Sequence, residues 1–271
     1  MNTFDYLNEY YNTHDENTRL SPKRGQVEFL TTIRYIERYL KPHMRILEIG
    51  AGTGRYSHYF ARAGYTVDAV ELIPHNIEIF RKNTETGENL TITQGNATDL
   101  SYYLDNSYDI TLLLGPMYHL FTKEDRQKAL AEAVRVTKPD GLLFVAYCMN
   151  EANVIQYGFM EGNIQNELCR TMMNPDTFRC DSSPKGIFVL HRKEDIDALN
   201  ASLPVHRLHF VGTDMFTRYM AKTVEAMDDK TYSLYLKYHF FICERTDLVG
   251  ISNHTLDILR KTAAKRQEPR K

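Results

Sequence analysis

The feature that most constrains this chain is a glycine-rich turn between an apolar run and a helical pattern. Residues 45–49 read Arg-Ile-Leu-Glu-Ile, and glycines follow at positions 50, 52 and 54. Glycine tolerates positive φ angles and lets the backbone approach a ligand closely. In an open α/β sheet, such a turn lies at the carboxyl end of a strand, which is where ligands bind.

The alternation of strand and helix continues along the chain. Further apolar runs with strand character cover residues 66–71, 90–93, 108–114, 142–147, 205–211 and 254–259. Helical patterns cover residues 22–40, 122–136 and 231–243, whereas residues 1–20 show no clear period. Strands separated by helices imply right-handed crossovers and a parallel sheet. We therefore predict an α/β fold with a doubly wound, mostly parallel sheet.

The length of 271 residues fits one domain with an elaboration. Residues 148–204 interrupt the alternation, and a long irregular insertion in an α/β protein is often a cap over a binding site. A purely structural elaboration is the alternative. The expected segments are an N-terminal helical segment (1–40), a ligand-binding core (41–147), an inserted cap between strands five and six (148–204), C-terminal strands and a helix (205–261) and a basic tail (262–271).

The composition excludes several classes of function. Lys and Arg total 33 and Asp and Glu total 35, so the net charge of -2 argues against nucleic acid as a partner. The four Cys form no CxxC pair and the ten His form no close-spaced cluster, so we predict no metal site. No apolar run reaches the ~18 residues of a membrane helix. The N-terminus does not resemble a signal peptide, so we expect a cytoplasmic protein with no membrane partner.

An acidic residue indicates the class of ligand. Glu71 ends the second strand, where a carboxylate can accept both ribose hydroxyls of a nucleoside. A dinucleotide fingerprint would require a third glycine at position 55, which is Arg. No Gly-Lys-Ser/Thr follows the turn, so the chain lacks a phosphate-binding Walker loop. The sequence therefore predicts an adenosine-type ligand other than a dinucleotide.

At this point, the motifs resemble those of class I S-adenosylmethionine-dependent methyltransferases of the bacterial small-molecule type. The resemblance covers residues 40–147. Its first motif is Ile46-Leu47-Glu48-Ile49-Gly50-Ala51-Gly52-Thr53-Gly54, and the acidic strand end at Glu71, the loop 95–100, the segment 108–120 and the turn 139–143 follow in order. It implies a Rossmann-like, seven-stranded sheet whose last strand is antiparallel.

The resemblance also implies a set of cofactor contacts. Glu48 and the backbone of the glycine turn would lie near the methionine part of S-adenosylmethionine, and Glu71 would hold the ribose. Asn96 and Ala97 would contact the adenine through a side-chain carbonyl and a backbone N–H. The expected cofactor-binding residues are Glu48, Gly50, Ala51, Gly52, Gly54, Glu71, Leu72, Asn96, Ala97, Leu114 and Gly115.

Two residues after the fourth strand are candidates for catalysis. His119 can take a proton at neutral pH, and Tyr118 can present an oxygen or a ring face to a cationic group. Packing of the loop is the alternative for both. The stretch Gly115-Pro116-Met117-Tyr118 lacks the Asn or Asp found in enzymes that methylate adenine-like nitrogens, which favours a small-molecule acceptor.

Other functions stay open at this stage. The acceptor could be nucleic acid or protein, which a basic surface beside the cofactor would favour. A non-catalytic S-adenosylmethionine-binding regulator is possible because fold does not fix function. An NAD-linked oxidoreductase is disfavoured by Arg55. The sequence indicates neither the acceptor atom nor the oligomeric state.

Overall fold

A central β-sheet organises the fold, and the computed structural model describes residues 2–263 of the chain. In space, the strands follow the order β3-β2-β1-β4-β5-β8-β7, and β6 pairs with β5 beside this path. The sheet thus contains the seven predicted strands and a short eighth strand, β6. The bounds are β1 (Arg45–Ile49), β2 (Thr66–Glu71), β3 (Leu90–Gln94), β4 (Tyr108–Leu113), β5 (Thr137–Met149), β6 (Leu190–His191), β7 (Val205–Gly212) and β8 (His254–Lys261).

The strand directions bring distant segments to one edge of the sheet. The pairs β3–β2, β2–β1, β1–β4 and β4–β5 are parallel, whereas β8 is antiparallel to both β5 and β7. This confirms the mostly parallel sheet with an antiparallel last strand. The ends of β1 to β5, the end of β7 and the start of β8 therefore lie along the same edge, which is the ligand-binding edge of open α/β sheets.

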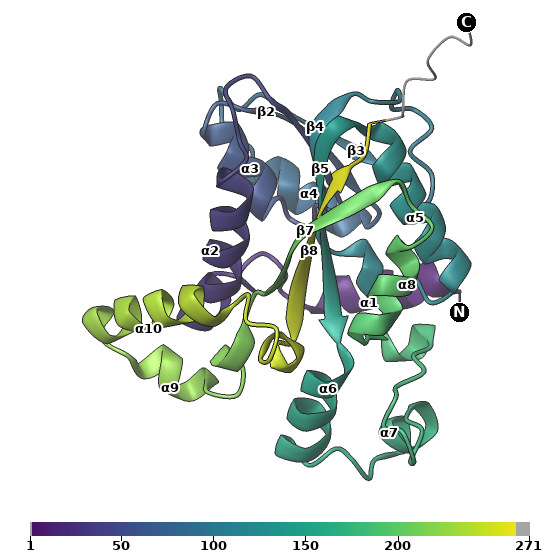
Figure 1. The fold of residues 1–271 in the computed structure, drawn as a ribbon, viewed down its shortest axis with the longest axis vertical. Coiled ribbons are helices and arrows are strands. Elements are labelled where there is room, and N and C mark those ends of the chain that lie inside the picture. The colour runs from purple at the N-terminus through teal and green to yellow at the C-terminus, as the bar shows by residue number, and fades with distance from the viewer. Residues whose placement is uncertain (1, 264–271) are drawn as a thin grey trace, which may run out of the picture.

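Helices cover both faces of the sheet. Figure 1 shows α2 and α3 on one side of it and α5 and α8 on the other. The bounds are α1 (Thr3–Thr13), α2 (Lys23–Glu37), α3 (Arg55–Arg62), α4 (Pro74–Asn83), α5 (Lys123–Val136), α6 (Asn150–Asn153), α7 (Glu167–Met172), α8 (Lys193–Asn200), α9 (Ala221–Ala226) and α10 (Asp229–Ile242). This arrangement confirms the predicted doubly wound α/β class.

Alternate residues of the inner strands feed two hydrophobic cores. Ile46 packs in one core with Phe29 of α2 and Phe60 of α3, whereas Leu47 packs in the other with Leu130 of α5. All five side chains are at most 5% exposed. Because successive strand residues point to opposite faces, the apolar run at the start of the glycine turn supports both layers.

The N-terminus departs from the sequence pattern. Residues 3–13 form helix α1 although they show no clear period, because Asn2 and Asp5 form a capping box that satisfies the first backbone N–H groups. The helix lies across the ligand-binding edge of the sheet and supplies side chains to the site described below.

The predicted cap contains several short elements. After β5, the chain forms α6, a π-helical segment (Val154–Met160), α7 and a 3-10 turn before β6 and α8. That this segment acts as a cap stays a prediction. The basic tail falls almost entirely outside the described residues. None of the described helices is long and apolar enough to cross a lipid bilayer.

Candidate functional site

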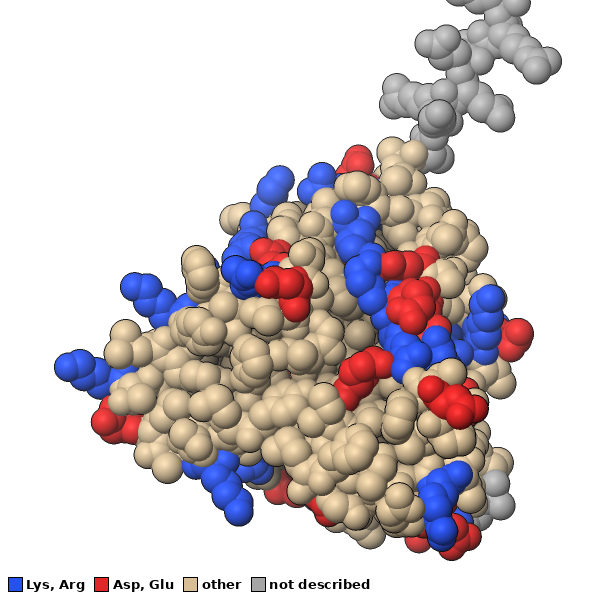
Figure 2. All heavy atoms as spheres, turned by 60° about the horizontal axis from the view of Figure 1, so that its bottom comes forward, with Lys and Arg blue, Asp and Glu red and all other residues tan. Residues whose placement is uncertain are grey.

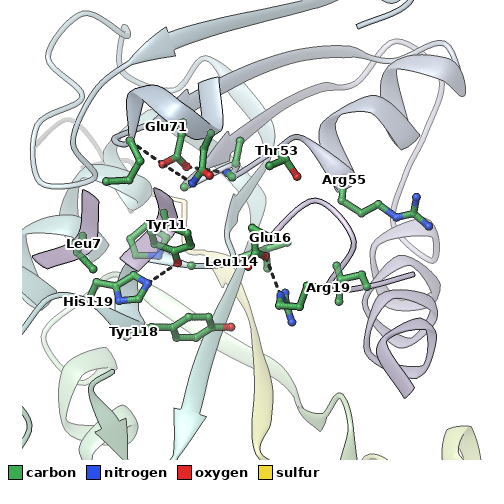
Figure 3. Close-up of a pocket in the computed structure, with 18 of the residues that line it drawn as sticks. Leu7, Tyr11, Glu16, Arg19, Thr53, Arg55, Glu71, Leu114, Tyr118 and His119 are labelled. Carbon is green, nitrogen blue, oxygen red and sulfur yellow. Dashed lines mark hydrogen bonds and ion pairs between the residues drawn. The ribbon is translucent and has the colours of Figure 1, made fainter. Parts of the chain in front are cut away.

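A cavity of about 770 Å³ opens at the carboxyl ends of the central strands. This volume falls in the range of small-molecule and cofactor sites. Its walls come from α1, the loop after α1, the ends of β1 to β5 and the segments at the end of β7 and the start of β8. Figure 3 shows Glu71 on one wall, opposite Tyr11 and Tyr118.

The glycine turn forms part of the first wall. Gly50, Gly52 and Gly54 have φ angles of 75°, 57° and 91°, so each needs glycine for its backbone conformation. A Cβ on Gly50 would lie 2.5 Å from Pro116, and one on Gly54 would lie 2.6 Å from Phe80. A Cβ on Gly52 would meet nothing closer than 3.7 Å. Gly52 therefore leaves open the space that a ligand needs, whereas Gly54, which does not line the cavity, keeps the turn packed.

Glu71 fixes this turn against the end of β2. Its carboxylate accepts hydrogen bonds from the backbone N–H groups of Gly52 (2.7 Å) and Ile73 (2.9 Å). Burial raises the pKa of Glu71, although these two hydrogen bonds act in the opposite direction. Leu72, which follows it, also lines the cavity. The site thus presents a carboxylate that is already oriented by backbone donors.

Glu48 lies beneath the turn and is 2% exposed. Burial raises its pKa to about 8, despite the opposing hydrogen bond from the Ser57 hydroxyl. The side chain is therefore mostly protonated at neutral pH. It can exchange hydrogen bonds with Ser57 and a ligand, but it does not supply a full negative charge to the cavity.

The loop after β3 closes one end of the cavity. Asn96 and Ala97 both line it, as predicted. The Asn96 side-chain oxygen accepts from the backbone N–H and the hydroxyl of Thr98, both at 3.0 Å. This carbonyl is therefore engaged within its own turn. Leu114 and Gly115 line the cavity where β4 ends.

His119 is held from both sides. Its Nδ1 donates to the carbonyl of Ile187 (2.9 Å), so in the neutral ring Nε2 accepts from the Tyr11 hydroxyl (2.8 Å). Burial lowers the pKa of His119 to about 4, against the contrary effect of the Ile187 carbonyl. The ring is therefore neutral at pH 7, and its acceptor nitrogen is used by Tyr11 (Figure 3).

Tyr118 lies beside His119 and has a different environment. Its side chain lines the cavity and is 8% exposed, and its hydroxyl makes no hydrogen bond to any described residue. Burial raises the pKa of Tyr118 well above 10, so the hydroxyl keeps its proton. Among the predicted catalytic residues, Tyr118 thus has the polar atom that a ligand can reach.

A cluster of ion pairs also lines the cavity, and the sequence analysis did not predict it. Arg19 contacts Glu28 at 3.0 Å and Glu16 at 2.8 Å. His254 Nδ1 lies 3.0 Å from Asp214 and 3.5 Å from Glu28. Burial alone would lower the pKa of His254, but Glu28, the Cys148 thiol and Asp214 together raise it to about 10.

The same cluster has the composition of a metal site. One ligand atom each of Glu28, Asp214 and His254 lie within 4.8 Å of one another. However, the Arg19 guanidinium bonds both oxygens of Glu28, and His254 is protonated at neutral pH. A metal ion would have to displace both cations, so the geometry favours an ion-pair network.

No local motif marks these additional residues. Glu28 belongs to α2, Asp214 follows β7 186 positions later, and His254 begins β8 a further 40 positions along the chain. The sheet topology is the signal that could have indicated Asp214 and His254. The end of β7 and the start of the antiparallel β8 lie at the same edge of the sheet as the glycine turn.

Comparison with known proteins agrees with this geometry. A family model described as a methyltransferase domain matches residues 47–145. A glycine/sarcosine N-methyltransferase of Aphanothece halophytica is 31% identical over 110 residues, which are 39% of this chain and 42% of that protein. A demethylmenaquinone methyltransferase of Renibacterium salmoninarum is 36% identical over 106 residues, 39% of this chain and 41% of that protein. The matching region thus spans less than half the length of these curated relatives.

Solved structures support the fold over a longer stretch. A crystal structure of a Pyrococcus horikoshii protein superposes with a TM-score of 0.62, covering 94% of this chain and 99% of that one at 14% identity. At this identity, the likeness establishes the fold alone. The methyltransferase motifs, the Rossmann-like fold and the cofactor inferred from the sequence are confirmed: residues 47–145 match a methyltransferase domain, and the chain resembles the S-adenosylmethionine-dependent methyltransferases.

Proposed function

We propose that this protein transfers the methyl group of S-adenosylmethionine to a small-molecule acceptor. The observation that carries the proposal is one cavity that joins Glu71 and the open Gly52 on one side to the free Tyr118 hydroxyl on the other. We call the first side the cofactor half (residues 48, 50–53, 71–72 and 96–97). The acceptor half comprises Tyr11, Tyr118, His119, Cys148 and the corner formed by residues 214–218 and 252–254.

The residues of the cofactor half fit the cofactor. Glu71 Oε2 takes only the Gly52 N–H and has a lone pair left for a ribose hydroxyl, whereas Oε1 takes the Ile73 N–H and, at 3.5 Å, the Asn76 side-chain amide. The backbone at Gly52 faces open space, where a Cβ would intrude on a bound ligand. When bound, S-adenosylmethionine supplies an electrophilic methyl group on a sulfonium, so the chain needs neither a metal nor a covalent intermediate.

The acceptor half orients the nucleophile and excludes water. In-line displacement requires a nucleophile about 3 Å from the methyl carbon, aligned with the breaking bond, in a dry site. Tyr118 touches the reacting region in this proposal, and its hydroxyl keeps its proton and can hydrogen-bond the acceptor. We assign His119 a positioning role, because its Nε2 is occupied by Tyr11 and its pKa is about 4.

A small acceptor is favoured over a macromolecule. Tyr11 of α1 bonds to His119 across the cavity and so narrows it from the N-terminal side. On the face shown in Figure 2, basic side chains alternate with acidic ones and form no continuous basic track for a polyanion. The relatives named above are glycine/sarcosine and demethylmenaquinone methyltransferases, which have small acceptors by name.

Calorimetry with S-adenosylmethionine and NAD tests this function. We expect S-adenosylmethionine to bind and NAD not to bind, and Glu71→Ala to weaken S-adenosylmethionine by about 10- to 100-fold, because charge-assisted hydrogen bonds are lost. Glu85→Ala, at an exposed position outside the cavity, is the control. Binding of NAD alone would refute the proposal.

Turnover then separates an enzyme from a binding protein. A panel of small amines, thiols, phenols and carboxylic acids is screened for release of S-adenosylhomocysteine. Release with at least one small acceptor is expected. If the protein binds the cofactor tightly and methylates RNA, DNA or protein but none of these small molecules, the acceptor is a macromolecule and the small-molecule proposal is wrong. No release with any acceptor would favour a regulator.

A further inference from the structure

Arg218 places in the acceptor half a cationic side chain that forms no ion pair with a described carboxylate. It follows the 3-10 turn Met215–Thr217 after β7, lines the cavity and is exposed. One guanidinium nitrogen donates to the side-chain oxygen of Asn253 at 3.0 Å. Within residues 2–263, no carboxylate oxygen lies within 4 Å of this guanidinium.

The nearby carboxylate of Asp214 makes no ion pair with Arg218, because other donors engage both of its oxygens, although the positive charge of Arg218 helps to lower the pKa of Asp214. One oxygen of Asp214 accepts from the Ser252 hydroxyl (2.7 Å) and from the backbone N–H groups of Asn253 (2.8 Å) and His254 (3.1 Å). The other oxygen bonds His254 Nδ1 at 3.0 Å. Asp214 thus fixes the corner at the start of β8 and leaves the fork of Arg218 available.

The other cavity arginines are accounted for. Arg19 is paired with Glu16 and Glu28, and Arg24 lies 3.5 Å from Glu225. Arg55 has no carboxylate partner among the described residues, but it follows the glycine turn and lies 4.5 Å above the ring of Phe29. Arg218 is therefore the cavity arginine that lies in the acceptor half and has no carboxylate within 4 Å among the described residues.

The residue that accepts from the Arg218 guanidinium is itself anchored by further hydrogen bonds. Asn253, which accepts from Arg218, donates through its amide nitrogen to Gln156 at 3.4 Å and through its backbone to Asp214. Gln156 belongs to the π-helical segment of the insertion. A fixed planar fork is suited to bidentate contact with a carboxylate or a phosphate.

We propose that Arg218 binds an anionic group, a carboxylate or a phosphate, of the methyl acceptor. This inference rests on the proposed function and narrows its substrate class. The Tyr118 ring lies 5.7 Å, between centroids, from the ring of His254 in the β7–β8 corner, so an acceptor whose anion is at Arg218 would place its nucleophilic atom on the Tyr118 side. Arg218 is a specificity-determining residue in this arrangement and takes no part in breaking the methyl–sulfur bond.

A binding experiment tests the anion site without knowledge of the acceptor. The full chain is saturated with S-adenosylhomocysteine and titrated with benzoate, benzamide and inorganic phosphate by calorimetry and ligand-observed NMR. We expect an anionic probe to bind at least about tenfold more tightly than benzamide. Arg218→Met should abolish this preference, Arg218→Lys should retain part of it, and Arg55→Met should leave it intact.

The relative affinities for benzoate and phosphate indicate which anionic group the acceptor carries. Tighter phosphate than benzoate indicates a phosphorylated acceptor, and the reverse indicates a carboxylic acid. Equal binding of benzoate, phosphate and benzamide by the wild type, or an unchanged preference in Arg218→Met, would overturn the inference. Because S-adenosylhomocysteine binding is measured in the same samples, failure to bind it would count against the proposed function instead.

Turnover of matched pairs provides a second test. Glycine is compared with glycinamide, and phosphoethanolamine with ethanolamine, together with any acceptor that the screen identifies. For an anionic acceptor, Arg218→Met should raise KM by about 10- to 100-fold and leave kcat and the affinity for S-adenosylmethionine nearly unchanged. Turnover confined to uncharged or purely cationic acceptors would contradict the anion site.

Discussion

The cofactor half of the cavity comes from short contiguous stretches of chain, whereas the acceptor half is assembled from distant ones. The glycine turn follows β1 and acts through its backbone, Glu71 ends β2 and presents a carboxylate that two backbone N–H groups fix, and residues 96–97 follow β3. Tyr11, Tyr118 and Arg218 come from α1, the end of β4 and the end of β7, and act through side chains.

This difference separates two kinds of constraint. A backbone contact depends on conformation, so it requires glycine at fixed positions and tolerates little change. A side-chain contact can be replaced by another residue while the strand ends that carry it stay in place. Substitutions in the cofactor half should therefore change S-adenosylmethionine affinity, and those in the acceptor half should change the KM for the acceptor or kcat.

The largest effect is expected at Gly52. Gly52→Val places a branched side chain in the open space of the cavity and forces a positive φ that costs about 1–2 kcal/mol for non-glycine residues. We expect S-adenosylmethionine affinity to fall about 100-fold or more, because close backbone approach is lost. Calorimetry measures the affinity.

Gly64→Val is the matched control for this substitution. Gly64 has a φ of 90° and open space around its Cβ position, and it lies at the end of α3 away from the cavity. The control should lose similar stability but keep the cofactor. Equal loss of affinity in both variants would show that Gly52 acts through folding alone.

A smaller effect is expected at the Tyr11–His119 pair. Tyr11→Phe leaves His119 Nε2 without its donor, so we expect kcat to fall about tenfold, as for a buried polar group left unpaired. S-adenosylmethionine affinity should change little. If His119 only positions Tyr11, then His119→Ala should cost about as much as Tyr11→Phe, and the double variant no more. A far larger loss in His119→Ala would identify it as a base.

The low pKa of His119 predicts a dependence of stability on pH. The folded protein takes up its proton near pH 4, whereas the unfolded chain takes it up near the ordinary value of 6.5. Between these values the unfolded state binds more protons, so this residue makes the fold less stable as the pH falls from 6.5 to 4. The fall in Tm over this window should be shallower in His119→Gln than in the wild type, and parallel curves would argue against the shift.

The smallest effect is expected at Glu48. Because its pKa is about 8, the side chain is mostly neutral at pH 7, and Glu48→Gln replaces a protonated carboxyl by an isosteric amide. We expect a change in cofactor affinity of about twofold or less, within the usual range of substitutions that keep hydrogen bonding. A loss comparable to that of Glu71→Ala would mean that Glu48 acts as an anion.

Much of the fold could be predicted because the inner strands are runs of mostly apolar residues. The run Ile46–Ile49 and the run that forms β4 are mostly apolar, and side chains on both faces of each strand are buried, as is typical of inner parallel strands. Helix α1 was not predicted, because its stability comes from the cap at Asn2 and from contacts with the rest of the protein rather than from a hydrophobic period.

The candidate site likewise contains residues that could be predicted from the sequence and residues that could not. Glu71 and Gly52 could be placed because each lies at a fixed distance along the chain from a strand end. Glu28, Asp214 and His254 could not, because their proximity depends on how β7 and β8 join the sheet. The engagement of His119 by Tyr11 also depends on where α1 lies, so sequence alone could name His119 but could not assign its hydrogen bonds.

The hydrogen bonding of Asp214 has a consequence for how the preference for an acceptor can change in evolution. Four donors hold this carboxylate, and none of them comes from Arg218. Position 218 can therefore accept other residues without unfolding the corner that carries it. A single substitution there could convert a preference for acids into one for neutral or cationic acceptors, while the glycine turn and its cofactor remain unaffected.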